Sequence, residues 1–168
     1  MTELTSAGVP AIGPDDHALG EGPEAIVYID FGCPHCAAEW VRLRALPLRL
    51  CFRHFPMAAK HPRAPFLHAA AEAAGLQDGF WEMCDSLFAE RGRVDDPHLW
   101  ERAERIGLEL ERFNEDRLSE AVAARVRRDF ESGIRAGVAG TPAAFAEGRR
   151  LSGEIAQELT SLGGQGAG

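Results

Sequence analysis

The sequence predicts an α/β protein with one central mixed sheet that is formed by two separated parts of the chain. Three observations support this fold class: an N-terminal strand–helix–strand pattern, a long middle stretch with helical spacing throughout, and a return to turn and strand signals before a last helix. With 168 residues and 45% hydrophobic composition, the chain has the size and apolar content of one well-filled domain.

The first part of the chain predicts a parallel strand pair. Residues 1–23 are rich in Gly, Pro and Asp and are interpreted as a loosely ordered lead-in, within which residues 17–20 are expected to pair at a sheet edge. Residues 25–31 are an apolar run typical of a buried strand, residues 34–46 have apolar positions near helical spacing, and residues 48–55 form a second strand. Strand, helix and strand in this order favour a right-handed βαβ unit.

The middle of the chain predicts helices only. Four apolar stretches with helical spacing follow one another, and Gly or Pro separates them, as is typical of helix ends and starts. These stretches comprise residues 66–74, 80–88, 99–106 and 118–134. We therefore expect residues 62–136 to be an all-helical subdomain that interrupts the sheet.

The last part of the chain predicts a hairpin and a helix. Turn signals over residues 137–142 precede the short apolar run 143–146, a turn at 147–149 and Leu151. Ile155, together with Leu159, predicts a final helix.

The order of these elements gives the domain organisation. We assign residues 1–61 and 137–162 to the sheet-forming domain, with 1–23 as its lead-in, and residues 62–136 to the helical insertion. The Gly-rich residues 163–168 have no side chains to bury and are expected to be a disordered tail.

Composition and charge limit the possible partners. The formal net charge is −8, and basic residues are interspersed with acidic ones, which argues against nucleic acid or an anionic membrane as a partner. No apolar stretch approaches the ~20 residues that a membrane-spanning helix needs, so we expect no membrane insertion. The chain begins with Met and its first residues have neither a basic nor an apolar leader region, so we expect a cytoplasmic protein.

The motif Cys33-Pro34-His35-Cys36 lies between the first predicted strand and the helix that follows it. At a helix N-terminus, the backbone N–H groups and the partial positive charge favour the thiolate of Cys33, and His35 adds a nearby donor or positive charge. These effects lower the pKa of Cys33 from about 8.5 into the range of roughly 3.5–7. We expect Cys33 to be the attacking and leaving thiol and Cys36, deeper in the helix, to resolve the mixed disulfide.

Zinc binding is the main alternative for this motif. Cys33, His35 and Cys36 together with His54 or His61 would supply four ligands. However, two adjacent ligands chelate awkwardly, and the sequence contains no second Cys-x-x-Cys motif. A static disulfide is the other alternative. The position of the motif between a strand and a helix favours redox chemistry over both alternatives.

Asp30, three residues before Cys33, is interpreted as a solvated turn residue, with tuning of the proton affinity of Cys33 as the alternative. Residues 25–29 contain no charged side chain. The sequence therefore predicts no buried carboxylate positioned to shuttle protons for Cys36.

The remaining two cysteines and two of the histidines are expected to have structural rather than catalytic roles. Cys51 and Cys84 lie in apolar patterns and are expected to be inert buried thiols, with a bridge between them as the alternative. His54 and His61 lie at the end of the second strand, where a histidine more often caps or solvates a strand end than takes part in catalysis.

Four segments of the chain together resemble a known family, the DsbA-type branch of the thioredoxin superfamily. They are Cys33-Pro34-His35-Cys36, Arg53-His54-Phe55-Pro56, Phe80-Trp81-Glu82-Met83 and Gly137-Val138-Ala139-Gly140-Thr141-Pro142. The resemblance covers roughly residues 15–157. It implies a thioredoxin fold with an inserted all-helical subdomain, and it implies a cis-proline at Pro142 that faces the dithiol.

The resemblance also implies a role for Thr141. A cis bond before Pro142 exposes the backbone of the preceding residue, so Thr141 is expected to pair with an extended substrate segment. Cys33, Pro34, His35 and Cys36 are accordingly the expected catalytic residues, and Thr141 and Pro142 the expected substrate-binding residues.

The function that we predict is protein thiol-disulfide exchange through a mixed disulfide, without a metal or organic cofactor. The expected partners are protein dithiols or disulfides and an unidentified redox partner, and the expected state is a monomer or a weak homodimer. Two alternatives remain: a relative that binds glutathione or another small thiol on the same scaffold, and a zinc- or partner-binding module without turnover.

Overall fold

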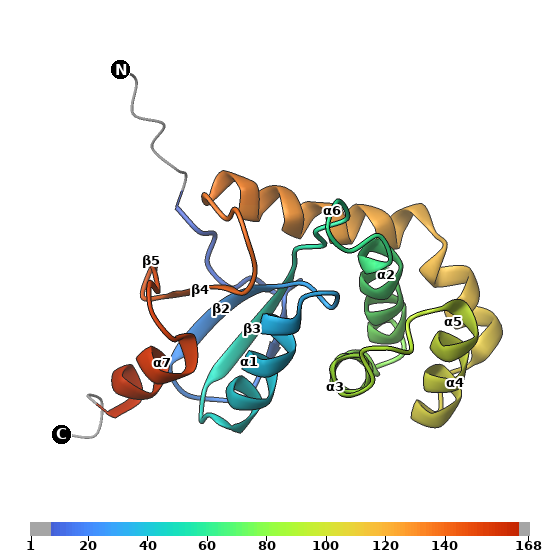
Figure 1. Cartoon of the computed structure of the whole chain (residues 1–168), viewed down its shortest axis with the longest axis horizontal. Helices are drawn as coiled ribbons and strands as arrows, with labels where there is room; N and C mark the ends of the chain where they lie inside the picture. Colours follow the sequence, from blue (N-terminus) through green and yellow to red (C-terminus); the bar gives the residue numbers. More distant parts are fainter. Residues whose placement is uncertain (1–7, 165–168) are drawn as a thin grey trace, which may run out of the picture.

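The protein consists of a five-stranded sheet, helices that pack on its faces, and a group of helices that projects from one end of it (Figure 1). The structure is a computed structural model, which describes residues 8–164. The strands are β1 (His17–Leu19), β2 (Glu24–Ile29), β3 (Arg49–His54), β4 (Ala143–Ala146) and β5 (Arg149–Arg150). The helices are α1 (Pro34–Ala45), α2 (Ala64–Gly75), α3 (Phe80–Ala89), α4 (Asp96–Ile106), α5 (Leu110–Arg117), α6 (Glu120–Arg135) and α7 (Ile155–Gly164).

The sheet is mixed, as the sequence predicts. Its strand order is β1-β3-β2-β4-β5. Strands β2 and β3 are parallel, whereas β1, β4 and β5 pair antiparallel to their neighbours. The βαβ unit therefore forms the centre of the sheet, and the C-terminal hairpin completes it. All helices between β3 and β4 belong to the stretch 62–136 that the sequence assigns to an insertion.

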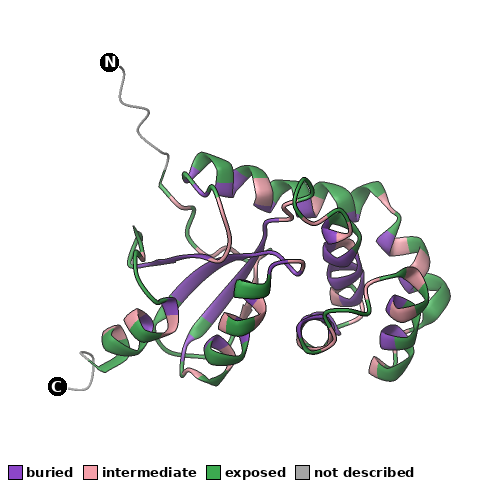
Figure 2. Ribbon diagram, in the orientation of Figure 1, coloured by how far each residue is buried: buried purple, intermediate pink, exposed green. Residues whose placement is uncertain are grey.

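The two faces of the sheet pack against different helices. Val27 and Ile29 of β2 belong to the larger core, which also contains Trp40 of α1 and Leu159 of α7. Alternate residues such as Tyr28 belong to a second, smaller core on the α6 side. This alternation follows from the two-residue period of a strand, and it explains why nearly the whole of β2 is buried (Figure 2).

Helix α6 crosses the second face of the sheet at close range. The hydroxyl groups of Tyr28 and Ser132 lie 2.8 Å apart, and the ring of Phe55 stacks on that of Phe130. Gly133 faces the rings of Tyr28 and Phe55, where no side chain fits without displacing them. A small residue at this position thus allows the helix to approach the sheet.

The helical insertion is also connected to α1. Trp40 donates its indole N–H to Asp85 of α3 at 2.6 Å, and Arg44 forms two hydrogen bonds with the same carboxylate. This contact fixes α3 against the helix that begins at the dithiol.

The positions of several apolar residues differ from the sequence prediction. Val41, Phe66, Leu118 and Ile134, which helical spacing placed on buried faces, are 71%, 45%, 66% and 53% exposed. Each lies near a helix end or on a helix flank that no other described element covers. Periodicity identified the helices but not the exact width of each buried face.

The expectation that residues 163–168 form a disordered tail is partly wrong. Helix α7 continues through residues 163 and 164, because the helix that begins at Ile155 extends into the glycines. Residues 165–168, and residues 1–7 of the predicted lead-in, lie outside the described part of the chain. Within residues 8–164, no helix combines the length and apolarity that crossing a bilayer requires.

Candidate active site

Cys33 and Cys36 lie at the start of α1. Cys33 is the N-cap residue in extended conformation, Pro34 occupies the first turn, and Cys36 follows inside it. Proline suits this position because its missing N–H would have no partner in the first turn of a helix. Both thiols are free, and Cys33 is 6% exposed whereas Cys36 is fully buried.

The surroundings of Cys33 favour its thiolate. The pKa of Cys33 is lowered to about 5, chiefly by the hydrogen bond from the Cys36 thiol. Burial opposes this shift, while the backbone N–H groups of Cys36 and His35 and the Thr141 side chain add to it. The first turn of α1 therefore supplies the anion-stabilising groups that the sequence predicts. At neutral pH Cys33 is ionised.

Cys36 has the opposite character. Burial raises its pKa far above the ordinary value, and the neighbouring Cys33 raises it further. The Cys36 sulfur accepts a hydrogen bond from the backbone N–H of Asp30 at 3.5 Å. One cysteine of the pair is thus a thiolate and the other a protonated thiol, although both are buried.

The Thr141–Pro142 peptide bond is cis, which confirms the expectation that the resemblance gives. This loop connects α6 to β4 and reaches the dithiol: in the thiol form, Cys33 donates to the carbonyl oxygen of Thr141 at 3.5 Å. The structure therefore brings Thr141 and Cys33 together from positions more than a hundred residues apart.

His35 is brought near the dithiol only through its backbone. Its side chain is exposed on α1, and it forms no hydrogen bond with any residue in the range 8–164. The contribution of His35 to the pKa of Cys33 comes from its N–H group at the helix start. Pro34 is likewise exposed.

Asp30 is buried, so the interpretation as a solvated turn residue is wrong. Its side chain is fully buried and accepts hydrogen bonds from the backbone N–H groups of Gly32 and Met57 at 3.0 and 3.2 Å. Burial would raise the pKa of Asp30, but His68 and these N–H groups together lower it. Only the backbone N–H of Asp30 contacts the Cys36 sulfur, so the statement that no buried carboxylate is positioned to shuttle protons for Cys36 stays a prediction. The strand ends one residue before Asp30, and the turn that follows folds inward.

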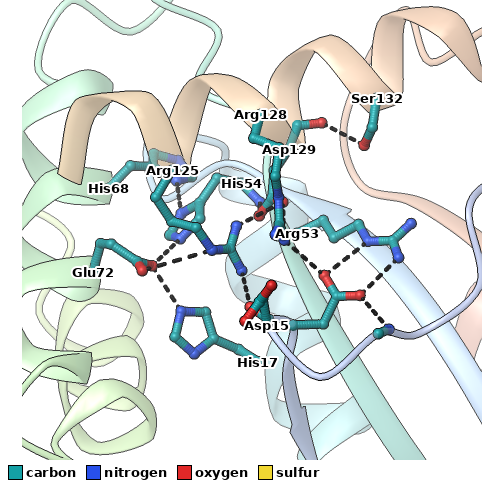
Figure 3. A network of polar contacts seen from close by, with 12 residues as sticks. Asp15, His17, Arg53, His54, His68, Glu72, Arg125, Arg128, Asp129 and Ser132 are labelled. Atoms are coloured by element: carbon teal, nitrogen blue, oxygen red, sulfur yellow. Dashed lines mark hydrogen bonds and ion pairs between the residues drawn. The ribbon is translucent and has the colours of Figure 1, made fainter. Parts of the chain in front are cut away.

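A chain of buried polar residues begins at Asp30 and runs into the helical insertion. Figure 3 shows its part from His68 to Glu72. Nε2 of His68 lies 3.3 Å from Oδ1 of Asp30 and accepts from the backbone N–H of Phe31, also at 3.3 Å. Burial lowers the pKa of His68 to about 4, so its ring is neutral at neutral pH. Nδ1 of His68 lies 2.8 Å from Nδ1 of His54, which is a hydrogen-bond distance. His54 is fully buried, which overturns its interpretation as a solvated strand end.

Glu72 forms the far end of this chain. It accepts hydrogen bonds from Nε2 of His54 at 3.0 Å and Nε2 of His17 at 2.7 Å, and Arg125 of α6 lies 3.8 Å away (Figure 3). Burial alone would raise the pKa of Glu72, but the bonds from the two histidines hold it well below its ordinary range. Arg125 also pairs with Asp129, which accepts the backbone N–H of His54 at 3.1 Å.

These residues also include the group that offers the best metal ligands in the described chain. Within residues 8–164, His17, His54 and Glu72 alone bring three donor atoms within 4.8 Å of one another. Oε2 of Glu72 lies 2.7 Å from Nε2 of His17 and 3.0 Å from Nε2 of His54. These are hydrogen-bond distances, so the carboxylate accepts a hydrogen bond from each ring nitrogen. The cysteines of the dithiol do not belong to this group, so the described geometry does not assemble the predicted alternative zinc site.

Sequence reasoning missed His68, Glu72 and His17. One signal was available: His68 and Glu72 are four residues apart on α2 and therefore share one face of an otherwise apolar helix. His61, by contrast, is partly exposed, and its Nε2 lies 3.9 Å from Asp30.

Cys51 and Cys84 are both buried free thiols, as predicted. They belong to different cores, Cys51 on the α6 side of the sheet and Cys84 in the larger core. The alternative of a bridge between them is therefore wrong. Burial raises the pKa of Cys51 to about 12 and that of Cys84 well above its ordinary value, which keeps both protonated.

A comparison with protein families identifies the family of the chain. The model of the DSBA-like thioredoxin domain matches residues 62–161, more than half of the chain. The chain belongs to this DSBA-like family. The family comprises DsbA-like thiol-disulfide oxidoreductases, and the match confirms the resemblance that the sequence motifs carry.

Solved structures share the DSBA-like fold at low sequence identity. A thioredoxin-like oxidoreductase from Silicibacter pomeroyi is 21% identical, with a TM-score of 0.79 over 92% of this chain and 93% of that one. The thiol-disulfide exchange protein α-DsbA2 from Wolbachia pipientis is 16% identical, with a TM-score of 0.81 over 92% and 88%. BdbD from Bacillus subtilis is 17% identical, with a TM-score of 0.79 over 94% and 95%.

Curated relatives of this DSBA-like chain are much longer proteins. A Na⁺/H⁺ antiporter NhaA 1 from Salinispora arenicola is 38% identical over 159 residues, which cover 89% of this chain and 24% of the relative. A Na⁺/H⁺ antiporter NhaA from Herminiimonas arsenicoxydans is 39% identical over 166 residues, 91% of this chain and 26% of the relative. The chain thus spans about a quarter of the length of these relatives. Their names refer to the whole proteins, and most of that length lies outside the matched segment.

Proposed function

We propose that this chain exchanges disulfides with protein substrates through Cys33, and that Cys36 resolves the mixed disulfide. The observation that carries the proposal is the opposite displacement of the two thiol pKa values, to about 5 for Cys33 and upward for Cys36. A thiolate is the attacking species in disulfide exchange, whereas a buried thiol stays protonated until its partner has reacted.

The exchange proceeds in two displacements. The Cys33 thiolate attacks a substrate disulfide, a bond forms between Cys33 and one substrate sulfur, and the other substrate sulfur leaves with the electron pair. Cys36 then gives its proton to the substrate thiolate released in the first step and attacks the Cys33 sulfur, so that the Cys33–Cys36 disulfide forms and the second substrate thiolate leaves. The reverse sequence oxidises a substrate dithiol.

We further propose that Thr141 and cis-Pro142 hold an extended substrate segment beside Cys33. The carbonyl oxygen of Thr141 lies 3.5 Å from the Cys33 sulfur. Because proline has no N–H group, the backbone at this position does not form a regular ladder with its own chain, and backbone groups of Thr141 are available to a substrate strand.

Trapping tests this function. A Cys36→Ala variant is expected to accumulate mixed disulfides with protein substrates, which non-reducing gels and mass spectrometry detect, and a Cys33→Ala variant is expected to accumulate none. Equal trapping by both variants, or trapping by neither, contradicts the proposal. Stoichiometric zinc that is lost with either cysteine supports a metal-binding module instead.

The reduction potential decides the direction of exchange. A value of about −120 mV indicates an oxidant, and one of about −270 mV indicates a reductant. The lowered pKa of Cys33 stabilises the reduced form, because a stable thiolate is a good leaving group. We therefore expect a potential on the oxidising side of this range, measured by equilibration with glutathione redox buffers.

A further inference from the structure

A pocket of ≈ 370 Å³ opens beside Gly32, the residue that precedes Cys33. Its walls come from the end of β2, from the loop between β3 and α2, and from the loop between α3 and α4. Its lining includes the buried apolar side chains of Phe31 and Leu67. The volume is at the lower end of the range for ligand pockets, which is about 300–1,000 Å³, and it suits one or two amino-acid side chains.

The pocket concentrates positive charge. Lys60, His61, Arg63 and Arg91 line it, and no Asp or Glu does. The whole chain carries a formal charge of −8 and contains more acidic than basic residues. A lining with four basic side chains and no carboxylate is therefore a local reversal of the charge of the protein.

The basic side chains of the pocket differ in their hydrogen bonds and ion pairs with the rest of the protein. Arg63 donates to the carbonyl oxygen of Val94 at 3.0 Å and to Asp96 at 2.8 Å, so the structure fixes its direction. Lys60 and Arg91 are exposed, and within residues 8–164 the structure gives no hydrogen bond or ion pair to either side chain. Two cations at the pocket thus have donors to offer to a ligand.

The start of α2 adds to this field. Ala64 and Leu67 of its first turn line the pocket, and that turn contains no acidic residue. The partial positive charge at the helix N-terminus is therefore not offset by a carboxylate of the same turn. Together with the cationic side chains, it favours a ligand with negative charge.

We propose that this pocket binds carboxylates that flank the reacting cysteine of a substrate, so that exchange at Cys33 prefers thiols and disulfides in an anionic setting. The inference rests on the proposed function, because the pocket selects substrates only if Cys33 exchanges disulfides. A peptide thiol of low molecular weight with free carboxylates and an acidic segment of a protein share this chemistry.

Peptides with an activated disulfide test the preference. In each probe the cysteine is linked to 2-thiopyridine and flanked on both sides by Glu, by Gln or by Lys. The Cys33 thiolate attacks the peptide sulfur, the Cys33–peptide disulfide forms, and the electron pair leaves with 2-thiopyridone, whose absorbance gives the rate. The protein is used reduced, at neutral pH and low salt.

The wild type is expected to react with the Glu peptide about five- to tenfold faster than with the Gln peptide, and slowest with the Lys peptide. This is the size expected for two or three surface ion pairs. The preference decreases as the ionic strength rises, because salt screens exposed charges. A Lys60→Gln/Arg91→Gln variant is expected to lower the ratio of the Glu and Gln rates to near one.

A control variant removes the same charge elsewhere. Arg135→Gln/Arg149→Gln loses two exposed cations that do not line the pocket, and it is expected to keep the wild-type ratio. Equal loss in both double variants shows that only the overall charge matters and overturns the proposal. Equal wild-type rates with Glu and Gln peptides overturn it as well.

The same assay separates this inference from the function on which it rests. If no peptide reacts with the wild type, the proposed exchange fails, and the inference fails with it. If all peptides react at one rate, exchange stands and the pocket has no role. To distinguish the sources, oxidised glutathione and its ethyl ester are compared with ten-residue peptides. If oxidised glutathione reacts faster than its ethyl ester, the ligand of the pocket is a small peptide thiol. If the charge preference appears only with the ten-residue peptides, the ligand is an acidic protein segment.

Discussion

Asp30 and Cys36 are joined by a hydrogen bond of 3.5 Å from the backbone N–H of Asp30 to the buried sulfur. The side chain of the same aspartate faces His68 of α2 at 3.3 Å. One residue at the end of β2 thus contacts both the resolving thiol and the helical insertion. The resolving thiol is therefore connected to the helical insertion through Asp30.

The first prediction concerns the ionisation of Cys33. Its rate of alkylation by iodoacetamide is expected to follow a titration with a pKa of about 5, because the thiolate is the reactive form. Cys36→Ala removes the hydrogen bond that lowers this pKa most. The variant is expected to raise the pKa of Cys33 by roughly one unit, because the net free energy of a typical hydrogen bond corresponds to a shift of that size.

Cys51→Ala is the matched control for this titration. It also removes a buried thiol, but from the opposite face of the sheet. The pKa of Cys33 is expected to stay near that of the wild type in this variant. A wild-type midpoint near pH 8.5 contradicts the thiolate assignment.

The second prediction links stability to redox state. In the unfolded reduced chain Cys33 titrates near 8.5, whereas in the folded chain its pKa is about 5. Between these values the unfolded state binds more protons, so the free energy of unfolding of the reduced form rises with pH, by at most about 1.4 kcal/mol per unit. The disulfide form lacks this thiol and lacks the rise.

Above pH ~8.5 the trend is expected to reverse, since Cys36 ionises there in the unfolded chain but not in the folded one. The difference in stability between reduced and oxidised protein therefore has a maximum near that pH. Denaturant unfolding of both forms from pH 5 to 10 measures it. A difference that stays constant across this range would refute the assignment of the two thiols.

The third prediction concerns the buried carboxylate of Glu72. Glu72→Gln removes the negative charge that two histidines and Arg125 face. The variant is expected to lose about 3 kcal/mol of unfolding free energy at neutral pH, because breaking a buried ionic network leaves charged and polar groups unpaired. Glu131→Gln, an exposed glutamate on α6, is the control and should change stability by less than about 0.5 kcal/mol.

The pH dependence of Glu72→Gln gives a second check. The pKa of Glu72 is lower in the folded chain than in the unfolded one, so its contribution is present above about pH 4.5 and is lost as the pH falls below that value. The gap between wild type and variant is therefore expected to narrow between pH 4.5 and 3. A gap that is constant or widens over this interval means that the carboxylate charge is not the stabilising feature.

The fold and the dithiol were predictable because their signals are local. Residues 25–31 and 34–46 show strand and helix periodicity, and the Cys-x-x-Cys motif lies at the junction between them. The cis bond before Pro142 was predictable through resemblance only, since an X–Pro bond has no sequence signal for the cis form.

The buried polar network was not predictable, because it depends on how distant elements meet. Asp30 has the composition of a solvated turn, and only the packing of α2 over the end of β2 buries it. His17, His54 and Glu72 come from β1, β3 and α2. Their polar groups have hydrogen-bond partners only when all three meet, and single-sequence periodicity contains no information on that meeting.

The last prediction concerns Gly133, where α6 approaches the sheet. A Cβ atom at this position would lie 2.8 Å from ring atoms of Phe55 and 3.0 Å from Tyr28, closer than real side chains pack. Gly133→Ala should gain up to about 1 kcal/mol of helix propensity, but the overpacking costs typically 1–3 kcal/mol. We expect a net loss of about 1–2 kcal/mol in denaturant unfolding. Gly92→Ala, whose Cβ would meet nothing within 4 Å, is the control and should be near neutral. An unchanged or increased stability of Gly133→Ala would show that α6 shifts away from the sheet at little cost.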